Sequence, residues 1–182
     1  MQEISLNILD IAQNSIRAGA LLTQIIINED HKEDLLTVEI IDNGSGMSEE
    51  QLLNVTDPFF TTRTTRSVGL GVPFFKMAAE QTGGFFEIKS TLGEGTYLKA
   101  AFKHSHIDRM PLGDMCSSIC IIIRMNKDID FLYRHTIDGK SFELDTCTIR
   151  ETLGDVPIDE PDVMAWIEEY IKENTAQINN QQ

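Results

Sequence analysis

The chain has 182 residues, enough for one domain or for one domain with a small appendage, and its formal net charge is −14 at pH 7. A sequence pI near 4.5 argues against nucleic acid and anionic lipid as partners, because both attract basic surfaces. No apolar run reaches the roughly 20 residues that span a bilayer, and the N-terminus lacks the pattern of a secretion signal. We therefore expect a soluble, cytoplasmic protein that does not contact a membrane. Three cysteines, an odd number, agree with a reducing compartment.

The first predicted element is an amphipathic helix over residues 3–18, in which isoleucines recur at three- and four-residue spacing. Gly19 follows at a position where helices commonly end. Asp10 and Asn14 are four residues apart and Arg17 is three further on, so their side chains share one helix face beside the apolar stripe. A solvent-facing helix would also group them in this way.

Two strands are predicted next, over residues 23–28 and 35–41, and the second leads into Asp42-Asn43-Gly44-Ser45-Gly46-Met47. A carboxylate at Asp42 can accept a hydrogen bond from an exocyclic amine, and glycines without a Cβ let the backbone approach a flat ring. Asn-Gly after an apolar run is also the strongest short-range signal for a hairpin turn. Alone, the segment favours a plain turn over a nucleotide site.

A short helix over residues 49–54 follows from a capping box formed by Ser48 and Gln51. Residues 59–67 combine hydroxyl and basic side chains without periodicity and are predicted to form a mobile loop. The loop leads into Gly69-Leu70-Gly71 and an apolar helix. A helix N-terminus flanked by glycine suits phosphate oxygens, although an isolated Gly-x-Gly more commonly serves as a connector.

The remaining elements are strands and one long helix. Strands are predicted over residues 85–90 and 96–102, joined by the turn Leu92-Gly93-Glu94-Gly95. Beyond them, the pattern predicts a β-meander over residues 118–125, 130–136 and 140–147, a helix from Pro161 to about Asn174, and a disordered tail over residues 177–182.

The spacing of the cysteines and histidines in the sequence does not predict a metal site. Cys116, Cys120 and Cys147 lack the paired Cys-x-x-Cys spacing and the fourth ligand typical of zinc sites, so buried structural thiols are favoured over a metal. His104-x-His106 follows the last of these strands and fits a solvated linker better than a metal pair.

Five motifs occur in the order and approximate spacing of the GHKL ATPases. They are Asp10-x-x-x-Asn14, Asp42-x-Gly44-x-Gly46-Met47, Pro58-Phe59-Phe60-Thr61-Thr62-Arg63, Gly69-Leu70-Gly71 and Gly93-x-Gly95-Thr96. Over residues 1 to about 103 the chain resembles this superfamily, which groups DNA gyrase, the heat-shock chaperone of the same fold, histidine kinases and MutL. The Phe-Phe-Thr-Thr and Gly-Leu-Gly segments look most like the histidine-kinase ATPase domain, whereas Asn14 to Ala20 looks closer to MutL.

The resemblance implies the Bergerat fold, an α/β (α+β) two-layer sandwich with helices over one face of a mixed sheet. We expect residues 1–103 to form the GHKL ATP-binding domain. Residues 104–182 are expected to form an extension, the β-meander and helix, that packs on this first domain.

The resemblance also implies ATP and Mg²⁺ as ligands. Asn14 is similar to the family asparagine that coordinates Mg²⁺, and Arg17 falls where histidine kinases often carry a phosphate contact. Asp42 resembles the aspartate that accepts a hydrogen bond from the adenine amine. The other ATP-binding positions are Gly44, Gly46 and Met47 at the base, Thr96 as the hydroxyl that supports the aspartate through water, and Gly69, Leu70 and Gly71 in the lid with Arg63 or Arg66.

Asp10 departs from the resemblance, because members that hydrolyse ATP carry a glutamate as general base four residues before the asparagine. An aspartate is one methylene shorter, and base catalysis requires heavy atoms within about 2.6 to 3.2 Å. Asp10 is therefore either a weakened base or one that works only if its helix lies closer to the phosphate.

We expect a regulatory protein that binds Mg-ATP and either phosphorylates a protein partner or hydrolyses ATP slowly. It is not expected to be a complete autophosphorylating histidine kinase, because the sequence starts at the asparagine helix, without the hairpin that carries a phosphoacceptor. The alternatives are a non-catalytic ATP-sensing module that binds proteins and, disfavoured by the charge, a MutL-like DNA-repair ATPase. Neither the partner nor the oligomeric state follows from the sequence.

Overall fold

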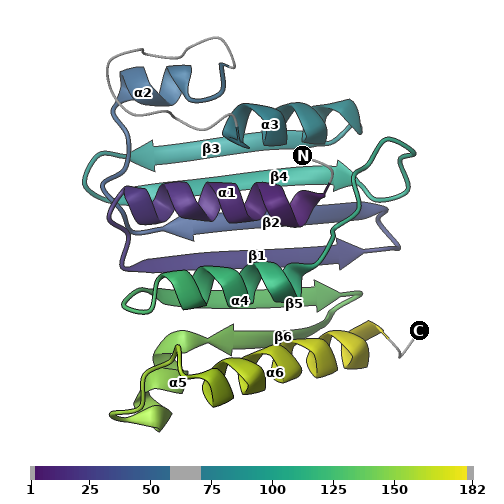
Figure 1. The fold of residues 1–182 in the computed structure, drawn as a ribbon. Helices are drawn as coiled ribbons and strands as arrows, with labels where there is room; N and C mark the ends of the chain where they lie inside the picture. Colours follow the sequence, from purple (N-terminus) through teal and green to yellow (C-terminus); the bar gives the residue numbers. More distant parts are fainter. Residues whose placement is uncertain (1–2, 58–70, 180–182) are drawn as a thin grey trace.

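The computed structural model describes residues 3–57 and 71–179, and it contains a six-stranded sheet in the order β3-β4-β2-β1-β5-β6 (Figure 1). The strands are β1 (Leu22–Asp30), β2 (Leu35–Asp42), β3 (Phe85–Thr91), β4 (Gly95–Lys103), β5 (Asp130–Ile137) and β6 (Lys140–Asp145). The helices are α1 (Ile4–Arg17), α2 (Glu49–Asn54), α3 (Gly71–Gln81), α4 (Met115–Met125), α5 (Thr146–Leu153) and α6 (Pro161–Asn179). β1 and β5 are parallel, and the other neighbouring pairs are antiparallel.

One face of the sheet is covered by helices, as a two-layer sandwich requires. In β1, Thr23, Ile25 and Ile27 are buried and alternate with half-buried residues, the period of two expected when a single face is packed. Figure 1 shows α1, α3, α4 and α6 over the same side of the sheet, and α1 contacts both β1 and β2. The predicted fold class, a mixed sheet with helices on one face, is confirmed.

On the face of the sheet that these helices leave open, side chains of opposite charge form pairs between neighbouring strands. Glu39 and Lys99 are opposite one another on β2 and β4, and the Lys99 ammonium donates to Glu39 at 2.8 Å. Arg134 and Glu143 are opposite on β5 and β6, with Nε of the arginine 2.8 Å from the carboxylate. Opposite charges at paired positions stabilise a sheet and suit a face in contact with water.

The predicted elements up to residue 103 agree with the structure to within two residues, wherever the structure describes them. The capping box of α2 is present, since the Ser48 side chain accepts from the Gln51 backbone and the Gln51 side chain accepts from the Ser48 backbone. Gly19 follows α1 with φ +76°, the left-handed conformation that ends many helices.

The first strand of the predicted meander is wrong, because residues 118–125 belong to α4. Asp114 caps this helix by accepting from the Ser117 backbone N–H at 2.9 Å. The buried residues then recur at helical spacing, with Ser118, Ile119 and Ile122 on the packed side. The other two strands form the hairpin β5–β6, although β6 ends at Asp145 and α5 begins at Thr146.

Two further C-terminal expectations are corrected. α6 continues to Asn179, and Ile178 is buried, so residues 177–179 are helical rather than a disordered tail. Cys116 and Cys120 are half-buried on α4, but Cys147 is exposed, so the prediction of buried thiols is wrong for Cys147. Burial and, to a smaller extent, the adjacent Cys116 raise the pKa of the Cys120 thiol to about 12, which keeps this sulfur protonated and unreactive at neutral pH.

Backbone from beyond residue 106 caps the first helix. Glu3 provides no side-chain cap for α1. Instead, the N–H groups of Ile4 and Ser5 donate to the carbonyls of Pro111 and Leu112 at 3.0 and 2.8 Å. These bonds satisfy two of the four donors that a helix start leaves open. Within the described residues, every helix is too short or too polar to cross a membrane.

Candidate functional site

Asp42 is held at the end of β2 by hydrogen bonds to both of its carboxylate oxygens. The Ser15 hydroxyl of α1 donates to Oδ2 at 2.6 Å, and the Gly44 backbone N–H donates to Oδ1 at 2.9 Å. These bonds fix the orientation of the carboxylate. Each carboxylate oxygen has a second lone pair, so Asp42 can still accept a bond from a ligand.

The segment after Asp42 does not form a hairpin turn. β2 pairs with β1, which precedes it, and with β4, whereas the chain after Asp42 continues to α2. The Ser45 N–H donates to the Ala18 carbonyl at 2.8 Å, and the Ser45 carbonyl accepts from the Gly93 N–H at 2.7 Å. The loop therefore joins the end of α1 to the β3–β4 turn, and the plain-turn interpretation is wrong.

Glycine is required in this loop by contacts within the protein. A Cβ at Gly46, which has φ +63°, would lie 2.0 Å from the Thr91 carbonyl oxygen. A Cβ at Gly44 would lie 3.0 Å from the Ala18 carbonyl oxygen. Any larger residue would push the loop away from the β3–β4 turn and from α1. Close approach to a flat ring, the reason expected from the sequence, stays a prediction.

Met47 and Thr96 are joined through a serine that the sequence analysis missed. The Ser90 hydroxyl of β3 accepts from the Met47 N–H at 2.9 Å, donates to the Gly95 carbonyl at 2.7 Å and lies 3.0 Å from the Thr96 hydroxyl. Thr96 is opposite Asp42 in the β2–β4 register, so their side chains lie on the same face of the sheet. Support of Asp42 through a water remains a prediction.

Asp10 lies on α1 against the first residue of α3. A Cβ at Gly71 would come within 2.0 Å of Asp10 Oδ2, so the backbone at the start of α3 directly faces this carboxylate. The N-terminal end of a helix carries positive partial charge, which favours a negative group at this position. Asp10 is half-buried, and α1 and α3 are in contact.

Asn14 follows Asp10 by about 6 Å along α1, at 1.5 Å per residue. Its amide oxygen accepts from Nη1 of Arg17 at 3.3 Å, and the guanidinium is exposed. That oxygen has a second lone pair. The amide oxygen of Asn14 is a hard oxygen ligand of the kind that Mg²⁺ prefers, so this face of α1 is chemically suited to a magnesium ion.

The structure thus brings most of the predicted site residues into two groups linked by α1. Asp42, Gly44, Gly46, Met47 and Thr96 surround the end of β2, and Asp10, Asn14, Arg17 and Gly71 lie along α1 and at the start of α3. Arg63, Gly69 and Leu70 lie outside the described residues, as do Arg66 and the predicted mobile loop.

Ser15 is the site residue whose sequence signal was overlooked. It continues the buried side of α1, after Ile8 and Ile11, at a position where the spacing predicts an apolar residue. A buried hydroxyl requires a hydrogen-bond partner, and Asp42 supplies it. The hydroxyl within the apolar stripe was therefore a detectable sign that α1 contacts a polar group of the sheet.

Comparison with known proteins places these residues in a family. Residues 1–106 match the family described as histidine kinase-, DNA gyrase B-, and HSP90-like ATPase. The sensor protein SrrB of Staphylococcus aureus (strain NCTC 8325 / PS 47) is 34% identical over 101 residues, which make up 53% of this chain and 17% of SrrB. The chain therefore spans about a sixth of the length of that relative.

One solved structure shares this fold at low sequence identity. The N-terminal domain of a DNA repair protein has a TM-score of 0.55 and 14% identity, over 80% of this chain and 53% of that chain. The Aquifex aeolicus MutL ATPase domain complexed with ADP has a TM-score of 0.49 and 14% identity, over 84% of this chain and 68% of that chain. Because the family match covers residues 1–106 of 182, the chain belongs to the histidine kinase-, DNA gyrase B- and HSP90-like ATPase family, the GHKL superfamily indicated by its five motifs.

Proposed function

We propose that the chain binds Mg-ATP between the end of β2 and the start of α3, and that it transfers the γ-phosphoryl group to a protein partner or, slowly, to water. The contact between Ser15 and Asp42 is the observation that carries this proposal. This bond fixes α1 relative to the Asp42 carboxylate. Asn14 precedes Ser15 on α1 and Asp10 lies one turn before Asn14, so the two side chains extend from the proposed adenine end toward α3.

Each residue has a distinct role in this proposal. Asp42 accepts from the adenine amine, because an oriented carboxylate is an acceptor only and the amine a donor. Asn14 and Arg17 serve the phosphates, with Mg²⁺ bound by the Asn14 amide oxygen. When bound, the ion neutralises phosphate charge. The N–H groups at the start of α3 offer further donors to phosphate oxygens.

Asp10 is the proposed general base, which takes the proton from the attacking hydroxyl or water. Its carboxylate lies against the backbone of Gly71 and next to the proposed phosphate position. The short side chain gives this base less reach than a glutamate, which agrees with slow hydrolysis and with a preference for a hydroxyl delivered by a partner.

We also propose that residues 1–103 form the nucleotide-binding unit and that residues 104–182 form an extension packed on it. Three contacts support the packing of the extension on this unit: β5 pairs with β1, α4 contacts α1, and the carbonyls of residues 111 and 112 cap α1. The net charge of −14 argues against a nucleic-acid substrate, so the regulated target is proposed to be a protein.

The experiment uses γ-labelled ATP with Mg²⁺ and cell extract, and asks whether label appears on a protein or as free phosphate. Asp10→Ala and the isosteric Asp10→Asn are both expected to abolish transfer while calorimetric ATP affinity stays within about threefold. Chelation of Mg²⁺ by EDTA is expected to weaken ATP binding in all three proteins. Full transfer by Asp10→Ala would refute the catalytic role, and ATP binding without any transfer by the unmodified protein would establish a nucleotide sensor instead.

A further inference from the structure

Three side chains that commonly bind transition metals converge at the end of the sheet opposite Asp42. Glu29 is near the end of β1, His31 is in the β1–β2 turn, and His104 follows β4. One potential ligand atom from each of the three lies within 4.8 Å of the other two. Nε2 of His104 is 3.2 Å from Oε2 of Glu29, and the rings of His31 and His104 have centroids 4.5 Å apart.

The Glu29 carboxylate is oriented by a buried partner. Nε2 of His135 lies 2.9 Å from Glu29 Oε1, and Nδ1 of the same ring lies 3.3 Å from the Tyr133 hydroxyl. His135 and Tyr133 are both buried, so this chain of hydrogen bonds has little freedom to rearrange. Metal-binding carboxylates are typically held by neighbouring groups in this way.

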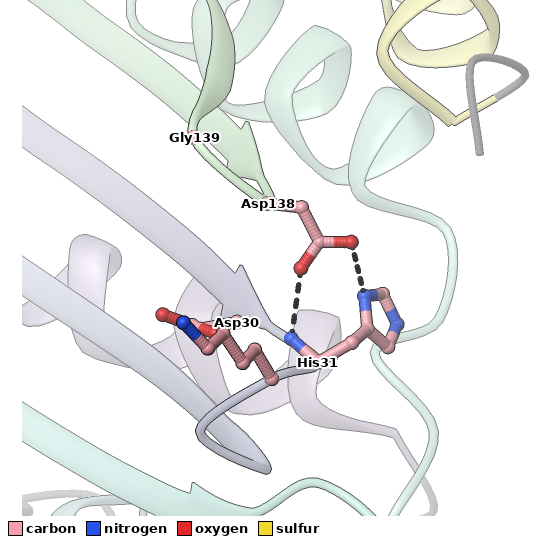
Figure 2. A pocket seen from close by; sticks show the side chains of 5 residues that line it. Asp30, His31, Asp138 and Gly139 are labelled. Carbon is pink, nitrogen blue, oxygen red and sulfur yellow. Dashed lines mark hydrogen bonds and ion pairs between the residues drawn. The ribbon is translucent and has the colours of Figure 1, made fainter.

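His31 is oriented by Asp138, from the turn between β5 and β6 (Figure 2). One carboxylate oxygen of Asp138 lies 2.9 Å from Nδ1 of His31, and the other accepts from the His31 backbone N–H at 2.9 Å. A carboxylate on one ring nitrogen fixes the tautomer of a metal-binding histidine. The metal would accordingly bind through Nε2.

His31 is accessible from solvent. Its side chain lines a surface pocket with Asp30, Lys32, Asp138 and Gly139 (Figure 2). An ion can therefore reach this side chain from solution.

We propose that Glu29, His31 and His104 bind a divalent transition-metal ion such as Zn²⁺. Two imidazoles and one carboxylate are a common protein donor set for zinc, and a fourth position would be taken by water or by a group from a partner. Mg²⁺ is not expected here, because it prefers oxygen ligands. Zinc–ligand bonds of about 2.0 to 2.2 Å require the three side chains to close by roughly an ångström, and we expect the exposed His31 to make most of this movement.

The proposed metal site is separate from the nucleotide site. Glu29 is seven residues along β1 from Leu22, whose carbonyl accepts from the Asn43 N–H beside Asp42. At about 3.3 Å per residue, the two sites are roughly 23 Å apart. Metal binding is therefore expected without nucleotide and in the Asp10 variants.

The test is titration of the metal-free full chain with Zn²⁺ by calorimetry and with Co²⁺ by absorption spectroscopy. One ion per chain is expected, with visible Co²⁺ bands of tetrahedral intensity. His31→Ala and His104→Ala are each expected to weaken binding at least about tenfold. His106→Ala is the matched control, because it removes a histidine only two residues from His104. The His106 side chain lies outside the cluster, with its Nδ1 3.9 Å from Asp108.

Circular dichroism is used to check that each variant is folded. Glu29→Gln, which preserves side-chain shape, serves as a further variant with the same expected loss of binding. The proposal is overturned if the unmodified chain binds no Zn²⁺, which would make the cluster a hydrogen-bonded structural contact. It is also overturned if the histidine variants bind as tightly as the unmodified chain, or if Co²⁺ gives a sulfur charge-transfer band, which would assign the metal to the cysteines.

Discussion

The carboxylate of Asp10 occupies the space that a side chain at position 71 would need. A Cβ built on Gly71 would lie 2.0 Å from Oδ2 of Asp10, a separation that real Cβ atoms do not adopt. Glycine at the first residue of α3 therefore lets two helices and a charged group meet without an intervening side chain. The same contact places the base proposed for phosphoryl transfer at a defined helix end.

Gly71→Ala is expected to destabilise the protein by about 1–3 kcal/mol, the usual effect of overpacking. Helix propensity acts in the opposite direction, because alanine is favoured over glycine by up to about 1 kcal/mol. In an Asp10→Ala background the collision is absent, so the same substitution should become neutral or stabilising. Urea unfolding of the four proteins measures the coupling, expected at about 0.5–3 kcal/mol. Equal effects of Gly71→Ala in both backgrounds would contradict the contact.

Asp42→Asn should weaken ATP binding by at least about tenfold, or about 1.4 kcal/mol. Both carboxylate oxygens already accept hydrogen bonds, and the new amide would point a donor at the Gly44 N–H, at Ser15 or at the adenine amine. Isothermal calorimetry measures the affinity. Glu49→Gln, an exposed change of the same chemistry in the first turn of α2, is the control. Unchanged affinity in Asp42→Asn would refute the adenine assignment.

Ser15→Ala should lower the free energy of unfolding by about 1.5–3 kcal/mol, the range for a hydrogen bond to a charged group. It should also reduce ATP affinity, but less than Asp42→Asn, because the carboxylate keeps its bond from Gly44. Ser5→Ala, at a buried serine of the same helix that is not bonded to Asp42, tests whether loss of any buried hydroxyl suffices. Equal loss of ATP affinity in both serine variants would contradict the role of Ser15.

Asp114→Ala should remove the N-cap of α4 and cost about 0.5–2 kcal/mol at neutral pH. Hydrogen bonds from the Ser117 side chain and backbone hold the pKa of Asp114 below its usual value. The stabilisation is therefore present above the unfolded pKa of about 3.9 and is lost as pH falls through the folded value. Chemical unfolding from pH 7 down to acid should show this cost shrinking.

Asp114→Asn supplies the comparison for that titration. Asparagine caps helices well and does not ionise in this range, so the energetic gap between Asp114→Asn and Asp114→Ala should stay nearly constant with pH. A gap that closes in acid along with the wild-type advantage would show that pH acts elsewhere in the fold.

The elements that the sequence predicted well are those in which local signals agree with tertiary packing. α1 has a clear apolar period, α2 has a complete capping box, and buried residues alternate along the first part of β1. α4 was mistaken for a strand because the run Ile121-Ile122-Ile123 is β-branched, which favours strands. Its helical character lies in the cap at Asp114 and in burial at three- and four-residue spacing, where docking between α1 and α6 overrides propensity.

The candidate site was predictable where one motif carries one role, and less so where segments far apart in the sequence meet. Asp42 and Asn14 stand out from their spacing, but the bond between Ser15 and Asp42 joins residues 27 positions apart. Ser90 is similar, since its hydroxyl links β3, β4 and the loop after β2. The Glu29 cluster joins the end of β1, the β1–β2 turn and the residue after β4, and no local pattern contains it.

The pairing of β1 with β5 has a consequence for any shortened form of the protein. A fragment ending at residue 106, where the family match stops, would leave the backbone of Leu22–Glu29 in β1 without its neighbour β5. β1 would then be an exposed edge strand, with unpaired N–H and C=O groups beside Ile25 and Ile27. A second molecule could add its own strand to this edge. We therefore expect that β5 protects this edge from association, and that a fragment without β5 aggregates.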